Sequence, residues 1–199
     1  KGQVQQGVIY ATIGQNPYAQ GHDPAIRLFN YLVAGELPPC ARLVTEAAVV
    51  TAENIDQYWT PGETPVPVAV TPADEGWFTS QCQPLDETWV TPLNVMPTEP
   101  LRIAVLGLEN NPFWIPVKQG AEAAAAELAA YNVTVDWIIP GETHTADNFA
   151  PGIEAAVAQG YDAIATIAGD AGVAPFIDAA VEAGIPVATF KAKPTRPMG

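Results

Sequence analysis

Four short apolar segments recur at regular intervals through the second half of the chain. They are residues 101–106, 133–139, 163–167 and 186–189. Three of them are nearly continuous apolar runs, which are typical of parallel strands covered by helices on both faces. We therefore predict four parallel strands in one sheet.

The segments between these strands have helical spacing. In the first, apolar side chains recur every three or four residues along one helix face: Trp114, Val117, Ala121, Ala124, Leu128 and Tyr131. Asn111 before Pro112 is suited to begin this helix. Two later helices, at about 148–159 and 173–183, should end at Gly160 and Gly184 in left-handed C-caps.

The order of these elements, βαβαβαβ, predicts an α/β fold. With short connections and right-handed crossovers it becomes a doubly wound, open parallel sheet with helices on both faces. In such sheets ligands bind at the carboxyl ends of the strands. The turns that follow the strands are therefore the first place to look for a site.

The first 59 residues contain one more unit of this kind. It consists of a strand at residues 8–13, a turn at 14–17, a helix at about 23–34 and a second strand at 42–51. We expect residues 8–13 to run parallel in the same sheet as residues 101–106, within one chain or between two.

Residues 60–100 differ from both flanking segments in composition. Eight prolines exclude long helices there and favour an extended connector. Trp77, Phe78 and Trp89 would be unfavourable in water, so the connector should lie along the domain surface. The predicted organisation is 1–59, a Pro-rich connector at 60–100, and 101–199.

The composition and net charge of the chain exclude some classes of binding partner. The 199 residues are 48% hydrophobic and carry a net charge of −14, with 8 basic and 22 acidic side chains. A field of this sign repels phosphate backbones, so nucleic acid is not an expected partner. No apolar run is long enough to span a membrane. We expect Lys1 to be the start of a mature or trimmed chain.

The two cysteines, Cys40 and Cys82, lack the spacing of a metal site or of a thioredoxin-type pair. Each lies in a polar, loop-like context. A disulfide between them is one interpretation, and two free thiols are the other.

Catalytic constellations are hard to find. Ser80 is the only serine and lies outside any nucleophile elbow, while His22 and His144 lack metal-ligand spacing and are expected at the surface. The turn at residues 107–112 lacks the glycines of a dinucleotide site. We expect neither enzymatic activity nor a cofactor.

Two turns nevertheless carry polar and aromatic groups suited to a sugar. Asn110 and Asn111 precede Phe113 and Trp114, and Asp170 follows the third strand. Amides and carboxylates bond hydroxyl groups, while aromatic faces cover C–H patches. The alternative is that Asn111 and Asp170 are helix caps.

These residues carry a resemblance to a known family. "LRIAVLGLENNPFWIPVKQGAEAAAAEL" and "AVAQGYDAIATIAGDAGVAPFIDAAVEAGIPVATF" resemble the amino-terminal lobe of periplasmic sugar-binding proteins of the ribose and galactose class, the type I periplasmic binding fold. "YATIGQNPYAQGHDPAIRLFNYLVAGE" resembles the family's carboxy-terminal end. The resemblance implies one lobe in permuted order, with the other lobe absent.

The resemblance also implies a set of ligand contacts. They fall on Asn111, Phe113, Trp114, Asp170 and Gln15. Lys191 stands where the family usually carries Asp. The sequence ends at Gly199, where the family crosses to its second lobe, so half of the usual pocket cannot be located in it.

The function implied by the resemblance is extracytoplasmic binding of a small sugar for an ABC importer or a receptor. One lobe alone should bind weakly, because it offers one wall of the cleft. An alternative is a structural subunit in which residues 1–59 complete the lobe of a neighbouring copy, giving a head-to-tail assembly. A third is a piece of a longer two-lobed or tandem protein.

Overall fold

The structure is a computed structural model that describes residues 2–35, 37–44, 47–55, 81–82 and 87–191. The chain divides into two units. One consists of residues 1–16 and 39–86, and the other of residues 17–38 and 87–199. Each unit is described by itself.

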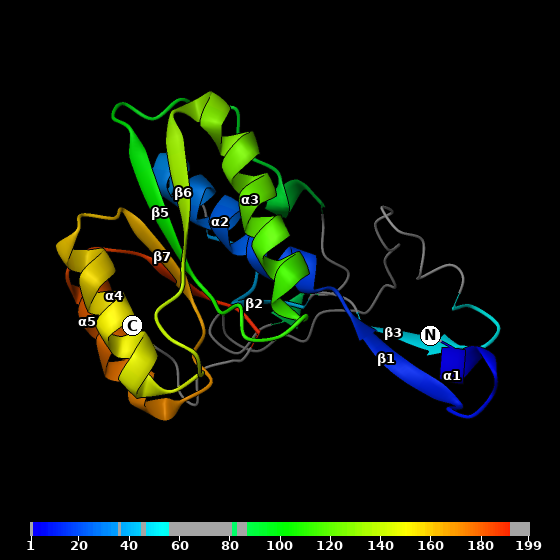
Figure 1. The fold of residues 1–199 in the computed structure, drawn as a ribbon. Coiled ribbons are helices and arrows are strands. Elements are labelled where there is room, and N and C mark those ends of the chain that lie inside the picture. Colours follow the sequence, from blue (N-terminus) through cyan, green and yellow to red (C-terminus); the bar gives the residue numbers. More distant parts are fainter. Residues whose placement is uncertain (1, 36, 45–46, 56–80, 83–86, 192–199) are drawn as a thin grey trace. The chain divides into compact units, whose positions relative to one another are not determined.

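A parallel sheet of four strands organises the larger unit (Figure 1). Its strands are β5 (Leu101–Leu106), β6 (Val133–Ile138), β7 (Ala163–Thr166) and β8 (Val187–Thr189), in the order β6-β5-β7-β8. The predicted α/β fold with one doubly wound parallel sheet is confirmed. All four strands end at the same edge of the sheet, which brings the following turns together.

Helices flank this sheet. They are α2 (Pro17–Ala34), α3 (Trp114–Leu128), α4 (Ala146–Ala158) and α5 (Ala174–Glu182). Helices α2 and α3 pack against each other, as do α4 and α5, and Figure 1 shows the two pairs on opposite faces of the sheet. The strand order reverses after β6, so right-handed crossovers place α3 on one face and α4 and α5 on the other.

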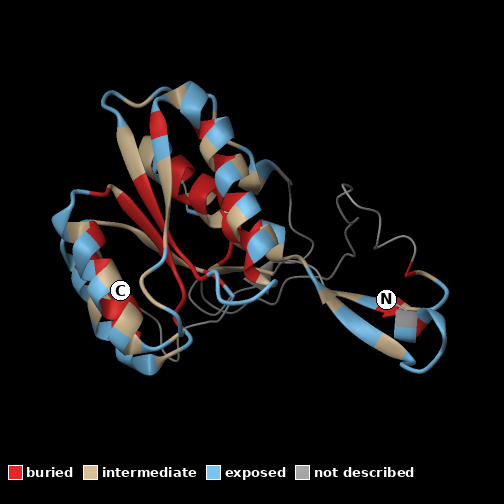
Figure 2. Ribbon diagram, in the orientation of Figure 1, coloured by how far each residue is buried: buried red, intermediate tan, exposed pale blue. Residues whose placement is uncertain are grey.

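The core of this unit lies between the sheet and the two helix layers. In Figure 2 the buried residues follow the strands and the helix faces turned toward them. Residues 103–106 of β5 are completely inaccessible to solvent, because strands on both sides and helices on both faces cover them. The largest buried side chains are Trp114, Phe29, Phe149 and Ile26.

The ends of the helices agree with their sequence signals. Gly160 and Gly184 have φ angles of 72° and 86°, the left-handed conformation predicted for them after α4 and α5. Short 3-10 turns lie at Ala129–Tyr131, after α3, and at Ala171–Val173, before α5. Helix α2 begins at Pro17, six residues before the predicted start, because proline is suited to a first helical turn.

Residues at the end of the predicted connector pack on α2. A 3-10 turn covers Glu87–Val90. The guanidinium of Arg27 donates to the carbonyl of Trp89 at 2.6 Å, and the amide of Asn30 donates to the carbonyl of Thr91 at 3.0 Å. Contact with the domain surface is therefore confirmed for this part, whereas Trp77 and Phe78 lie outside the described residues.

The smaller unit contains short elements. They are α1 (Gly2–Gln5), β1 (Ala11–Gln15), β2 (Arg42–Leu43), β3 (Ala47–Thr51) and β4 (Gln81–Cys82). Strands β1 and β3 are antiparallel neighbours, and β2 pairs with β4 in parallel. Val4, Val50 and Ile55 form its small buried cluster.

The predicted place of the first strand is wrong within the single chain. Strand β1 pairs with β3 in a separate sheet and not with β5, and the strand predicted at residues 42–51 is two strands, β2 and β3. An apolar strand pattern indicates extended backbone, but the choice of neighbour depends on long-range contacts. Helix α2, by contrast, does pack on the predicted lobe. In the described part of the chain, no helix is long and apolar enough to cross a membrane.

Candidate functional site

The turns that follow the four parallel strands are linked to one another by side chains. The amide of Asn110, after β5, donates to the carbonyl of Glu142, after β6, at 2.7 Å. Asp170, after β7, accepts from the backbone N–H of Ala146 at 2.8 Å, and Lys191, after β8, lies 3.3 Å from His144. The four turns therefore form one connected surface at the carboxyl edge of the sheet.

Asn111 is exposed on this surface. Its Oδ1 accepts from the backbone N–H of Phe113 at 3.0 Å, and its Nδ2 donates to Oδ1 of Asn110 at 2.8 Å. Helix α3 begins later than predicted, at Trp114, with no side-chain cap at Phe113. Asn111 thus orders the turn before the helix and still offers polar atoms to solvent.

The two aromatic residues of this turn have different surroundings. Trp114 is 1% exposed and packs near Trp137 and His144, with ring centroids 6.4 and 5.3 Å away. Phe113 is half-buried and meets Trp114 edge to face at 5.4 Å. Phe113 is therefore the ring that a solute can reach, while Trp114 belongs to the core.

A lysine contacts both rings. The Nζ of Lys191 lies 4.7 Å from the centroid of Phe113 and 4.5 Å from that of Trp114, within cation–π range. Its Nζ is also 3.3 Å from Nε2 of His144. Because an ammonium can only donate, His144 accepts at Nε2. Burial and the charge of Lys191 lower the pKa of His144, which favours this neutral form.

Asp170 joins two turns through backbone hydrogen bonds. Its Oδ1 accepts from the N–H of Gly172 at 2.9 Å, and its Oδ2 accepts from Ala146 at 2.8 Å. These two hydrogen bonds hold the pKa of Asp170 below its usual range. The capping interpretation of Asp170 is therefore correct, and the remaining lone pairs of the carboxylate can still accept hydroxyl groups.

Gln15 does not lie in the same unit as the other predicted contacts. It is the last residue of β1, is exposed, and pairs with Ala47 in the smaller unit. The structure brings together Asn111, Phe113, Trp114 and Asp170, and the role of Gln15 stays a prediction.

Two residues of this edge were not among the predicted contacts. Lys191 follows β8 by two residues, and His144 lies in the turn after β6. The rule that selected Asn111 and Asp170, a polar side chain in the turn after a parallel strand, would also have found both. The expectation of surface histidines is wrong: His144 is half-buried, and His22 lies on α2 with its side chain 12% exposed.

His22 belongs to a separate polar contact between α2 and α3. Its Nδ1 is 2.9 Å from Oδ1 of Asp23, and its Nε2 is 3.2 Å from Oε1 of Glu127. Burial disfavours the imidazolium, but the two carboxylates outweigh it and raise the pKa of His22. Among the described residues, no group of three or more His, Cys, Asp and Glu could hold a metal ion.

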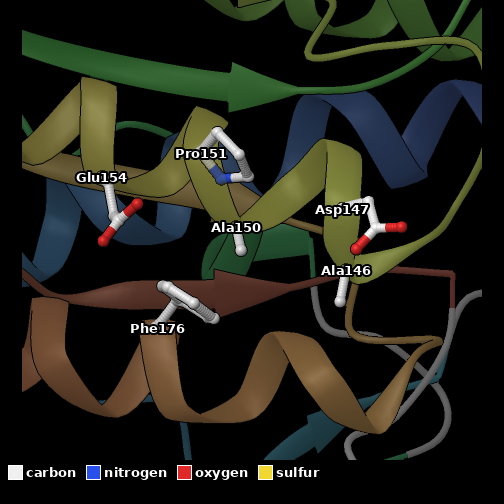
Figure 3. Close-up of a pocket in the computed structure, with 6 residues that line it drawn as sticks. All are labelled: Ala146, Asp147, Ala150, Pro151, Glu154 and Phe176. Atoms are coloured by element: carbon white, nitrogen blue, oxygen red, sulfur yellow. The ribbon is translucent and has the colours of Figure 1, made fainter.

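Two shallow pockets are present in the larger unit. One, of about 340 Å³, adjoins the carboxyl edge and is lined in part by Asn111, Trp114 and Ile115. The other, of about 290 Å³, lies between α4 and α5, and Figure 3 shows Asp147 and Glu154 on its α4 side and Phe176 on its α5 side. The second pocket contains none of the sequence-predicted contacts.

A comparison with protein families finds a similarity that includes this edge. Residues 104–198 match the family model described as the periplasmic binding protein domain. The matched residues are just under half of the chain, and this part of the chain is similar to that family. The domain includes β5 from Ala104 onward, the three later strands and all four edge turns, whereas Gln15 and α2 precede the matched residues.

One solved structure similar to the chain is an ABC transporter periplasmic solute binding protein from Actinobacillus succinogenes 130z with bound D-allose. The identity is 21% and the TM-score 0.39, over 45% of this chain and 30% of that protein. This chain thus spans under a third of that protein's length. No curated protein matches the chain.

Proposed function

We propose that the chain is an extracytoplasmic solute-binding module that takes a small sugar at the carboxyl edge of its four-stranded sheet. It would pass this sugar to an ABC importer or a receptor and carry out no covalent step. The proposal rests on the periplasmic binding protein domain at residues 104–198 and on the chemistry of the edge turns.

The observation that carries the proposal is the meeting of three kinds of group on one surface. Asn110 and Asn111 supply amides, Phe113 supplies a half-buried ring, and Asp170 supplies a carboxylate held ionised by backbone N–H groups. Amides and carboxylates match sugar hydroxyl groups, and the ring matches a C–H face. The edge turns supply one wall of a binding site, and one wall alone is expected to bind weakly.

Titration calorimetry with a panel of pentoses and hexoses tests the proposal. At least one sugar should bind, and Asn111→Ala should lower its affinity about fivefold, the effect of one neutral hydrogen bond. Gln159→Ala is the matched control, because it removes an exposed amide at the opposite edge of the sheet, after α4. If no sugar binds, or if both variants weaken binding equally, the proposal is wrong.

The alternative is a structural subunit in which residues 1–59 complete the lobe of a neighbouring copy. Its support is the exposure of apolar side chains there: Val8 is 70% exposed, Tyr10 90%, Ile13 63% and Val49 57%. A two-stranded ribbon gains stability from a further strand or helix on such a face. Sedimentation velocity over a range of concentrations tests this alternative. Growing polymers would support it, and a monomer at every concentration would contradict it.

A further inference from the structure

The basic side chain at the carboxyl edge has no acidic partner there. The chain has 8 basic residues against 22 acidic ones, yet Lys191 makes no salt bridge with any described carboxylate. Other cations of the larger unit do: Lys118 lies 2.6 Å from Glu109, and Arg102 lies 3.6 Å from Asp136. The charge of Lys191 is therefore available to a ligand at this edge.

Several contacts fix the position of that charge. The ammonium of Lys191 lies over the rings of Phe113 and Trp114, and it donates to Nε2 of His144. The ammonium has three N–H groups, and the hydrogen bond to His144 uses one of them. Partial burial lowers the pKa of Lys191, and an anionic acceptor would offset that loss of hydration.

The backbone of Lys191 also has an unusual conformation. Its φ angle is 66°, in the left-handed region that residues with a side chain rarely adopt. Such a conformation costs free energy, and residues that adopt it cluster at active sites and ligand-binding positions. It occurs here two residues after β8, where the lysine can reach the turn that follows β6.

We propose that Lys191, held by His144 and the two aromatic rings, is the subsite for the carboxylate of an acidic sugar. The ligand would be a sugar acid, with its hydroxyl groups on Asn111 and Asp170 and its carboxylate on the ammonium. This inference rests on the proposed function, since it concerns the same edge. With a net charge of −14, the protein repels an anion unless a fixed local cation compensates it.

The test measures binding of matched pairs to the full chain. Calorimetry compares glucose with glucuronate and galactose with galacturonate, and acetate serves as the anion without hydroxyl groups. Each acid should bind about tenfold more tightly than its neutral parent, the effect of one charged hydrogen bond, and acetate should not bind measurably.

Three variants test whether Lys191 causes the preference for acids over neutral sugars. Lys191→Gln should abolish it, and Lys191→Arg should retain it. The control Arg102→Gln also removes a cation from a cation–π contact, that of Arg102 with Tyr161 at 4.1 Å, but at the opposite edge, so the preference should persist.

The outcomes separate the two proposals. If neutral sugars bind as tightly as their acids in the unmodified chain, this inference is wrong and sugar binding stands. It is also wrong if Lys191→Gln keeps the preference. If acetate binds as tightly as the acids, the subsite takes any carboxylate and the assignment to sugar acids fails. If neither sugars nor acids bind, the proposed function itself is wrong.

Discussion

At the scale of single residues, the side chains that link the turns of the carboxyl edge also have polar atoms that can bind a ligand. Asp170 and Asn111 both satisfy backbone N–H groups, as caps do. In the sequence these residue types lie in turns after predicted strands, which was enough to predict that they lie at the carboxyl edge of the sheet. It could not show that Trp114 is covered, because Lys191 and His144 reach it from turns far away in sequence.

The two backbone hydrogen bonds of Asp170 predict a pH effect on stability. The folded state lowers the pKa of this carboxyl, so its contribution is present above the ordinary value of 3.8 and is lost as the pH falls through the lower, folded value. Asp170→Asn removes the charge and keeps one side-chain oxygen that can accept a hydrogen bond. Its urea midpoint should lie below that of the unmodified chain at about pH 6, and the difference should shrink below about pH 4.

Asp147→Asn is the control, because it removes the same charge from the exposed first turn of α4. The difference between its urea midpoint and that of the unmodified chain should change less with pH than the difference for Asp170→Asn. A difference for Asp170→Asn that stays constant from neutral to acidic pH would contradict the account.

At the scale of elements, the helix pair α2 and α3 is set by two glycines. A Cβ atom on Gly21 would overlap the carbonyl of Val117, and one on Gly120 would overlap the carbonyl of Tyr18. The two backbones therefore approach each other closely at this crossing. Both obstacles are backbone atoms, which cannot move aside without shifting a helix.

Gly120→Ala should consequently destabilise the protein by about 3 kcal/mol, although alanine is the better helix former. Ala126→Ser is the control, since it adds one atom at an exposed position of the same helix and should change stability by less than about 1 kcal/mol. Urea unfolding measures both. Equal effects would show that the close crossing is not a constraint.

The elements differ in how far the sequence could predict them. The bounds of β5 agree with the prediction and those of α4 lie within two residues, because apolar periodicity and terminal signals are local. The neighbour of β1 was mispredicted, because pairing is decided by contacts between distant segments. The close approach at Gly21 and Gly120 also depends on two helices meeting, which periodicity cannot show.

At the scale of the whole molecule, the smaller unit needs support beyond its three-residue buried cluster. Cys40 is 1% exposed and disulfide-bonded. The side chain of Cys82, the other cysteine, lies outside the described residues, but the backbone pairing of Leu43 with Cys82 brings the two segments together. The pairing of Cys40 with Cys82 stays a prediction.

Thiol titration of the unfolded, unreduced chain should therefore find no free thiol. The bond would close a loop of about 40 residues, and reduction should cost about 3 to 4 kcal/mol in the chain-entropy model. The variant with both cysteines changed to serine provides the comparison. Two titratable thiols in the unreduced chain would contradict the bond.

The central claim for the whole molecule is that a solute binds at the carboxyl edge of the four-stranded sheet. A titration of the ¹⁵N-labelled chain with pentoses, hexoses and their acids, followed by amide chemical shifts, tests it most directly because this method detects weak binding and locates it. We predict saturable shifts concentrated in residues 107–113, 139–145, 167–172 and 190–191, with little change at residues 159–162 of the opposite edge. Shifts concentrated in the α4–α5 pocket or in the smaller unit, or no shifts with any of these compounds, would contradict the claim.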